Sequence, residues 1–67
     1  MIVEIVSTGD ELISGSIIDT NASYLASKFL EIGILVKRCS IVGDDKMEIQ
    51  KVLKEISLRS DIVVVTG

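Results

Sequence analysis

Several residue types are absent or scarce in this 67-residue chain, which has no histidine, no proline, no tryptophan and a single cysteine. One cysteine excludes an internal disulfide, and the absence of histidine excludes a structural metal site of the zinc-finger kind. We expect Cys39 to be a small buried apolar side chain rather than a reactive thiol, because no histidine is present to activate it.

Long hydrophobic runs and excess positive charge are also absent. No apolar run approaches the roughly 18 residues that a membrane-spanning helix needs, so we expect no membrane partner. The N-terminus lacks the basic segment that opens a signal peptide. Seven Lys and Arg against ten Asp and Glu give a net charge of −3, which argues against a nucleic-acid partner. These features predict a cytoplasmic protein.

The chain is nevertheless rich in apolar residues, at 48% hydrophobic content and a mean hydropathy of +0.54. A free domain of about 60 residues buries only ~60% of the surface that its unfolded chain exposes. We therefore expect further chain of the same domain, another subunit, or both to cover the excess. On this interpretation the 67 residues are the N-terminal part of a larger domain.

The secondary structure is predicted to alternate between strands and helices. Residues 62–65 form an unbroken β-branched and apolar run, typical of a parallel strand that is covered on both faces. The other predicted elements are strands at residues 2–8 and 34–42 and amphipathic helices at residues 21–32 and 46–58. The strand at 34–42 contains polar residues and is expected at a sheet edge. The order β-α-β-α-β predicts an α/β fold with a parallel sheet and right-handed crossovers.

The connection at residues 11–20 is long for a compact α/β unit, which usually joins its elements with two to six residues. Long ordered connections are often functional. We expect this one to be an ordered loop that four apolar side chains hold in place: Leu12, Ile13, Ile17 and Ile18.

Small polar residues and glycines follow all three predicted strands, and the carboxyl ends of parallel strands lie at one edge of a sheet. Glycine allows a ligand to approach the backbone closely, and free N–H groups at helix N-termini favour anions such as phosphate. The residues at the three strand ends are Ser7, Thr8, Gly9 and Asp10, then Gly43, Asp44 and Asp45, then Thr66 and Gly67.

The same edge carries four carboxylates, those of Asp10, Glu11, Asp44 and Asp45. They would repel phosphate on their own. A hard divalent cation such as Mg²⁺ resolves the repulsion, because it takes oxygen ligands and bridges carboxylates to phosphate. The residues therefore predict a Mg²⁺-assisted phosphate or pyrophosphate site. Neither a G-x-G-x-x-G dinucleotide motif nor a P-loop is present.

Each of these features also has a purely structural explanation. Asp44 and Asp45 can simply cap the helix that follows them, and the run Asp19-Thr20-Asn21 can do the same for the earlier helix. A glycine after a strand can be only a turn. The coincidence of three polar strand ends at one edge favours the functional interpretation.

The motifs also resemble a known family in order and spacing. They resemble the start of the MoaB/Mog molybdopterin-binding-like domain, and most closely the N-terminal domain of the CinA competence/damage-inducible proteins. The resemblance covers essentially all 67 residues, as the N-terminal part of such a domain that is incomplete at its C-terminus. The matching segments are Ser7-Thr8-Gly9-Asp10-Glu11-Leu12, Gly15, Asp19-Thr20-Asn21, Val42-Gly43-Asp44-Asp45, Arg59-Ser60-Asp61 and Thr66-Gly67.

The resemblance implies a three-layer α/β/α domain that acts on a small-molecule nucleotide or a pterin phosphate, and it implies a homo-oligomer. In the CinA branch it implies divalent-metal-dependent hydrolysis of ADP-ribose and similar pyrophosphates. In the molybdenum-cofactor branch it implies a molybdopterin-binding module, and a non-catalytic domain of the same fold is the third alternative. By resemblance, Asp44 and Asp10 are catalytic and hold the metal with Asp45, while Ser7, Gly9, Thr66 and Gly67 line the phosphates.

Overall fold

The computed structural model describes residues 1–67, in which strands and helices alternate along the chain. The elements are β1 (Val3–Thr8), α1 (Asp10–Ile13), α2 (Thr20–Glu31), β2 (Arg38–Val42), α3 (Lys46–Ser57) and β3 (Ile62–Thr66). None of these helices is long and apolar enough to cross a membrane.

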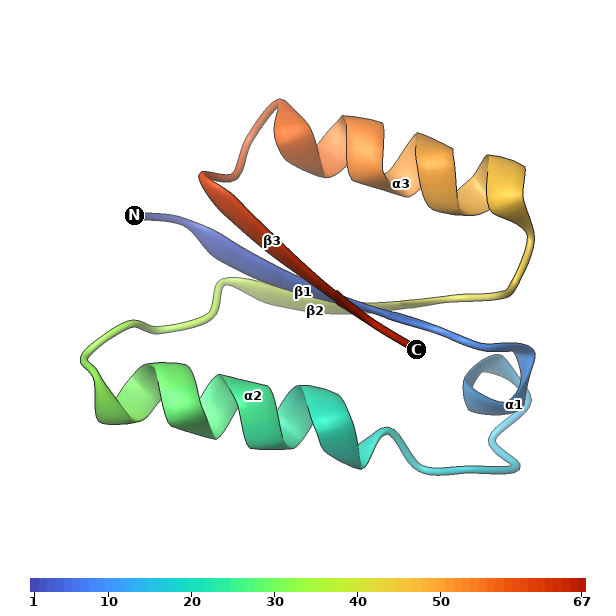
Figure 1. Ribbon diagram of the computed structural model, residues 1–67, viewed down its shortest axis with the longest axis horizontal. Helices are drawn as coiled ribbons and strands as arrows, with labels where there is room; N and C mark the ends of the chain where they lie inside the picture. The colour runs from blue at the N-terminus through green and yellow to red at the C-terminus, as the bar shows by residue number, and fades with distance from the viewer.

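The three strands form one parallel sheet in the order β2-β1-β3, so β1 is the central strand. The connection from β1 to β2 and the connection from β2 to β3 cross the sheet in opposite directions. Crossovers of the same hand therefore place α2 and α3 on opposite faces. Figure 1 shows this arrangement, with α2 below the sheet and α3 above it. The α/β fold with a parallel sheet is confirmed, as is the edge position of β2.

Both long helices begin at an aspartate whose side chain satisfies a free backbone N–H group. Asp19 accepts a hydrogen bond from the Ala22 N–H (3.2 Å), and Asp45 accepts one from the Met47 N–H (2.9 Å). Gly33, with a φ of 84°, follows the end of α2 in the left-handed region that glycine tolerates. These local signals explain why both helices lie within one residue of their predicted bounds.

The core is small and centred on β1. Val3, Ile5 and Val6 have no exposed surface, and Val6 packs with Val42 and Ile56 under α3. Only nine of the 67 residues are buried. Many large apolar side chains therefore remain on the surface. They are the excess of apolar residues, beyond what a chain of this length can bury, that the composition indicated.

The prediction that β3 is covered on both faces is wrong for this chain. Ile62 and Val65 are 39% and 48% exposed, because β3 is an edge strand here and β1 takes the central, fully buried position. The buried position predicted for Cys39 is also wrong. Cys39 lies on the other edge strand and lines an open hollow between α2 and β2, so its side chain is exposed.

The connection after β1 also differs from the prediction. It contains the short helix α1, and Ile13, Ile17 and Ile18 are 60%, 57% and 81% exposed rather than packed. Backbone hydrogen bonds order the segment instead, since the Leu12 N–H donates to Gly9 O (3.1 Å) and the Ile17 N–H donates to Glu11 O (3.2 Å).

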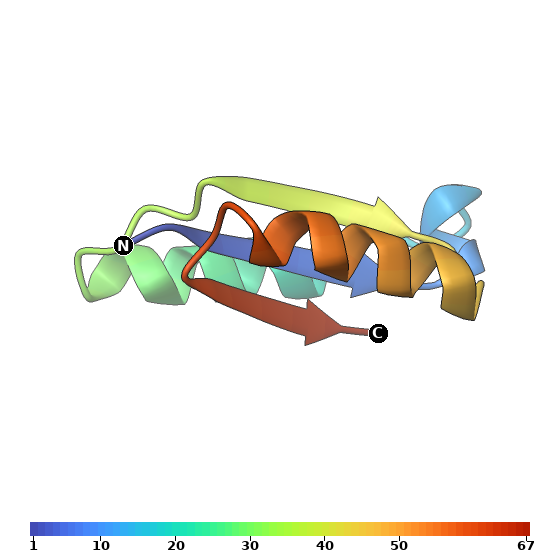
Figure 2. The ribbon, with the colours of Figure 1, turned by 90° about the horizontal axis from the view of Figure 1, so that it is seen from above.

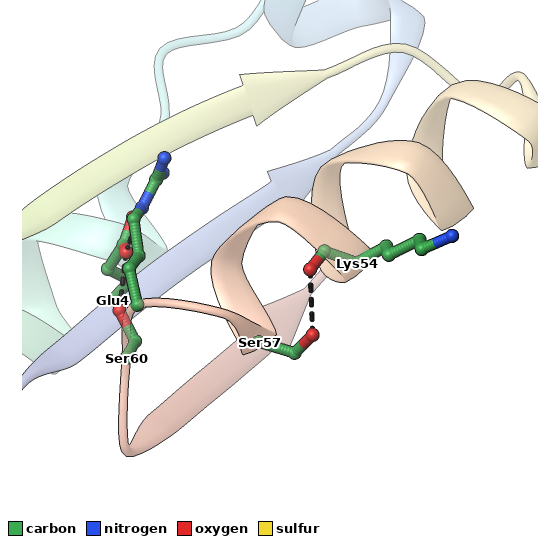
Figure 3. Close-up of polar contacts among 5 residues, drawn as sticks. Glu4, Lys54, Ser57 and Ser60 are labelled. Atoms are coloured by element: carbon green, nitrogen blue, oxygen red, sulfur yellow. Dashed lines mark hydrogen bonds and ion pairs between the residues drawn. The ribbon is translucent and has the colours of Figure 1, made fainter.

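An ion pair between a buried carboxylate and a partly exposed guanidinium ties β1 to the turn before β3, at the edge of the sheet opposite the predicted site. The Glu4 side chain has no exposed surface, and its carboxylate accepts hydrogen bonds from Arg59 Nε (2.8 Å) and Nη2 (3.0 Å). The Ser60 hydroxyl donates to the same carboxylate, as Figure 3 shows. The hydrogen bonds from Arg59 are the largest cause that lowers the pKa of Glu4 from 4.5 to about 2, against burial, which raises it.

Candidate functional site

The carboxyl ends of the three strands meet at one edge of the sheet, as the sequence predicted. Figure 2 shows the strands pointing the same way, with α1 beyond their ends. The Gly9 N–H donates to Val42 O (2.9 Å), which joins the ends of β1 and β2. The Thr8 hydroxyl donates to Thr66 O (3.5 Å) and links β1 to β3.

Asp10 and Asp44 are brought together by two reciprocal hydrogen bonds. The backbone N–H of Asp10 donates to Asp44 Oδ2 (3.2 Å), and the backbone N–H of Asp44 donates to Asp10 Oδ1 (3.0 Å). The two residues are 34 positions apart in the sequence, and both are exposed at the sheet edge. Each carboxylate keeps a second oxygen that makes no hydrogen bond within the chain, so both can still accept a ligand.

The glycine before Asp44 makes this close approach possible. A Cβ atom at Gly43 would lie 2.7 Å from Asp10 Oδ1, closer than side-chain carbons come to such an oxygen. At the third strand end, a Cβ at Gly67 would lie 2.5 Å from Thr8 Oγ1. The missing side chains at these glycines therefore let the strand ends and the acidic side chains pack against one another.

The carboxylates of Asp10 and Asp44 fit the way in which proteins usually hold Mg²⁺. No group of three or more acidic, histidine or cysteine side chains is close enough to form a metal cage. Mg²⁺ sites, however, often use one or two carboxylates together with water and substrate phosphate. Asp10 and Asp44 supply two such carboxylates. Asp45, also predicted as a metal ligand, caps α3: its Oδ1 accepts a hydrogen bond from the Met47 N–H, and its Oδ2 has no partner within the chain.

A hollow of about 190 Å³ lies beside the strand ends on the α2 face of the sheet. It brings together the ends of β1 and β3, the segment after β1 and the first residues of α2. Its lining residues are Ser7, Glu11, Leu12, Ile17, Ile18, Asp19, Thr20, Asn21, Thr66 and Gly67. Ser7, Thr66 and Gly67, which were predicted to face a ligand, thus share one hollow, whereas Gly9, Asp10 and Asp44 do not line it.

Ser7 has the only buried side-chain polar atom without a hydrogen-bond partner. The residue has no exposed surface and pairs with Thr66 across the sheet, at the bottom of the hollow. Sequence reasoning placed Ser7 at the site but missed the contribution of Thr20 and Asn21 to it. The run Asp19-Thr20-Asn21 gave the available signal, but it was interpreted there as a helix cap.

Comparison with known proteins connects this geometry with one family. Residues 4–67 match the family described as "Probable molybdopterin binding domain". A CinA-like protein of Anaeromyxobacter sp. (strain Fw109-5) is 48% identical over 65 residues, which is 97% of this chain and 16% of that protein. A CinA-like protein of Myxococcus xanthus (strain DK1622) is 46% identical over 67 residues, which is 100% of this chain and 16% of that protein.

A solved structure shares the fold. The crystal structure of CinA from Thermoplasma acidophilum, described as a protein of unknown function, superimposes with a TM-score of 0.91 at 29% identity. The match covers 98% of this chain and 39% of that one. The chain thus spans a minor part of the proteins that it matches. With its parallel three-stranded sheet and paired aspartates at the carboxyl edge, the chain belongs to the probable molybdopterin-binding domain family and is similar throughout to CinA-like proteins.

Proposed function

We propose that the full-length protein is a divalent-metal-dependent nucleotide pyrophosphatase that acts on substrates of the ADP-ribose class. The observation that carries the proposal is the reciprocal pairing of Asp10 and Asp44 at the carboxyl edge of the sheet. This pairing holds each carboxylate against the backbone of the other residue and leaves one oxygen of each without a partner. Similarity to CinA-like proteins along the whole chain supports the same proposal.

In the proposed reaction, the chain's own residues bind and orient the substrate. Asp10 and Asp44 would hold Mg²⁺ or another divalent cation, and Gly9, Thr66 and Gly67 would line the phosphates, since glycine has no side chain of its own to keep a ligand from the backbone. The bound cation would polarise the phosphoryl group and activate water. Water adds to phosphorus as the bond between phosphorus and the bridging oxygen breaks, giving AMP and ribose 5-phosphate from ADP-ribose.

Incubating the full-length protein with ADP-ribose tests this proposal. We expect AMP and ribose 5-phosphate to form in equal amounts with Mg²⁺ and neither to form with EDTA, because the two aspartates alone supply no positive charge for the phosphates. Separation of the nucleotides by chromatography measures both products. The absence of AMP release with every divalent metal tested would contradict the proposal.

The alternative function is a molybdopterin-binding module of cofactor biosynthesis, which the description of the matched family favours. A protein of this kind would bind a pterin phosphate tightly and release no AMP from ADP-ribose. A domain that keeps the fold without catalysis would do neither. We also propose a homo-oligomer, since exposed apolar side chains such as Leu35 and Ile32, at 78% and 72% exposure, would be covered by another subunit or by further chain.

A further inference from the structure

The outer edge of β2 has no strand beside it. β2 pairs only with β1, and Figure 2 shows β2 and β3 on opposite sides of that central strand. The Gly9 N–H donates to Val42 O, so Val42 turns its backbone groups toward β1. Because the backbone groups of successive strand residues point to alternate sides, those of Ile41 and Cys39 point outward. A free edge of this kind is a template for pairing with another strand.

Apolar side chains lie along the α2 face of this edge. Five residues that line the hollow of about 370 Å³ between α2 and β2 are apolar: Ala26, Leu30, Leu35, Val36 and Cys39. Ile41 follows Cys39 on the same face of the strand and is 43% exposed. The edge therefore combines free backbone groups with an apolar surface, and such surfaces mark sites of protein–protein contact.

The charges at the two ends of β2 have opposite signs. Lys37 and Arg38 lie at its start, Asp44 and Asp45 follow its end, and all four are exposed. Basic residues often protect an edge strand against pairing, but here they occupy one end only. Two β2 strands that run antiparallel set the basic start of each against the acidic end of the other. Parallel strands would set like charges together, which is destabilising. The edge thus complements a second copy of itself.

We propose that a second copy of this chain docks on this edge by antiparallel pairing of the two β2 strands about a twofold axis at Ser40. This inference rests on the homo-oligomer proposed above and is independent of the proposed hydrolysis. Ser40 is the middle residue of the strand, so this register pairs all five of its residues. Cys39 then lies opposite Ile41 of the second copy, and their outward backbone groups bond to one another.

The proposed pairing also covers the apolar surface and satisfies the charges. A twofold axis perpendicular to the sheet keeps the α2 faces of both copies on the same side. Ile41 of the second copy therefore lies beside Cys39, where it covers the hollow, and the same contact occurs on the other side of the axis. Lys37 comes near Asp45 of the second copy, and neither residue forms an ion pair within its own chain.

Crosslinking through Cys39 tests this geometry. In the proposed register the two copies of Cys39 are diagonal neighbours, with Cβ atoms roughly 7–8 Å apart. We expect a short bis-maleimide to link the full-length protein into a covalent dimer on a denaturing gel, and Cys39→Ser to lose that dimer. A protein that sediments as a dimer without this link would keep the homo-oligomer and overturn the surface. A monomer whose Cys39 resists a simple maleimide would show that further chain covers the edge, which would overturn both.

Charge reversal at the start of β2 gives a second test, with the dissociation constant of the full-length dimer measured by sedimentation. Lys37→Glu should raise this constant at least about tenfold, because it creates like-charge contacts on both sides of the axis. High salt should reduce the effect by screening. Lys51→Glu makes the same charge change at an exposed position on α3 and should alter the constant less than about twofold. Equal effects of the two variants, or no effect of Lys37→Glu, would contradict the proposed surface.

A proline at Ile41 tests the backbone pairing itself. The N–H of Ile41 points away from β1, so Ile41→Pro removes a hydrogen bond to the second copy and spares those within the sheet. We expect a monomer that has lost the Cys39 crosslink. An intact dimer with an unchanged crosslink would contradict strand pairing at this edge. AMP release is measured separately, so its absence would refute the proposed hydrolysis without affecting this inference.

Discussion

Replacing Asp44 by asparagine should lower metal-dependent AMP release from ADP-ribose at least ~100-fold, a loss of roughly 2.7 kcal/mol of transition-state stabilisation. The amide oxygen of asparagine can still accept the hydrogen bond that the Asp10 N–H donates to Asp44 Oδ2, so the local geometry is kept. What the substitution removes is the negative charge that would hold the cation. Initial rates with saturating Mg²⁺ measure the effect.

The control for this variant is Glu48→Gln, which removes the same charge from the first turn of α3. It should change the rate less than about twofold, since Glu48 takes no part in the pairing of Asp10 and Asp44. Equal losses in the two variants would indicate a general electrostatic effect. A full rate in Asp44→Asn would remove this residue from the reaction.

Replacing Arg59 by methionine should lower the free energy of unfolding of the full-length protein more than the loss of an exposed ion pair does. The change leaves the buried Glu4 carboxylate without its guanidinium partner, and a buried charge without a partner is destabilising. The loss is limited because the Arg59 side chain is 44% exposed and because Ser60 still donates to Glu4. Urea denaturation at pH 7 measures the difference.

The exposed pair Lys28–Glu31, at 3.3 Å, provides a matched control for Arg59→Met. Its side chains are 52% and 63% exposed, so Lys28→Met should cost less than about 0.5 kcal/mol. The double variant Glu4→Leu with Arg59→Met should recover part of the lost stability, because it removes the unpaired buried charge. A loss in Arg59→Met no larger than in Lys28→Met would contradict a stabilising role for the Glu4–Arg59 pair.

The same ion pair predicts how stability depends on pH. The pKa of Glu4 falls from 4.5 to about 2 on folding, so the folded state binds its proton less readily than the unfolded state. The stabilisation is therefore complete above pH 4.5 and is lost as the pH falls toward 2. In Arg59→Met the hydrogen bonds that lower the pKa of Glu4 are gone. The difference in stability between variant and wild type should therefore shrink as the pH falls from 4.5 toward 2.

The two long helices, α2 and α3, and their bounds could be predicted because their signals are local. Asp19 and Asp45 lie next to the turns that they cap, and the apolar spacing that follows each one is visible in a single stretch of sequence. The meeting of Asp10 and Asp44 was also accessible, because the topology of a parallel sheet brings strand ends together. The reciprocal hydrogen bonds between the two aspartates could not be predicted, because these bonds depend on the close approach of Gly43 to Asp10.

The errors arose where burial depends on the order of the strands. The sequence of β3 is typical of a central strand, but within this chain only β1 has a neighbour on each side. Cys39 belongs to an edge strand whose α2 face is left partly open, so its apolar character does not bury it. Glu4 interrupts the apolar run of β1, and its partner Arg59 is 55 residues away. A lone carboxylate in a buried strand was the available signal for an ion pair.

A calorimetric titration of Mn²⁺ into the full-length protein tests directly whether Asp10 and Asp44 together form one metal site. Mn²⁺ shares the preference of Mg²⁺ for carboxylate oxygens, and saturating AMP supplies a phosphate. We expect one ion per chain, bound at least about tenfold more weakly by Asp10→Asn and by Asp44→Asn. Binding of equal strength in the wild type and both variants, or no binding to the wild type, would contradict it.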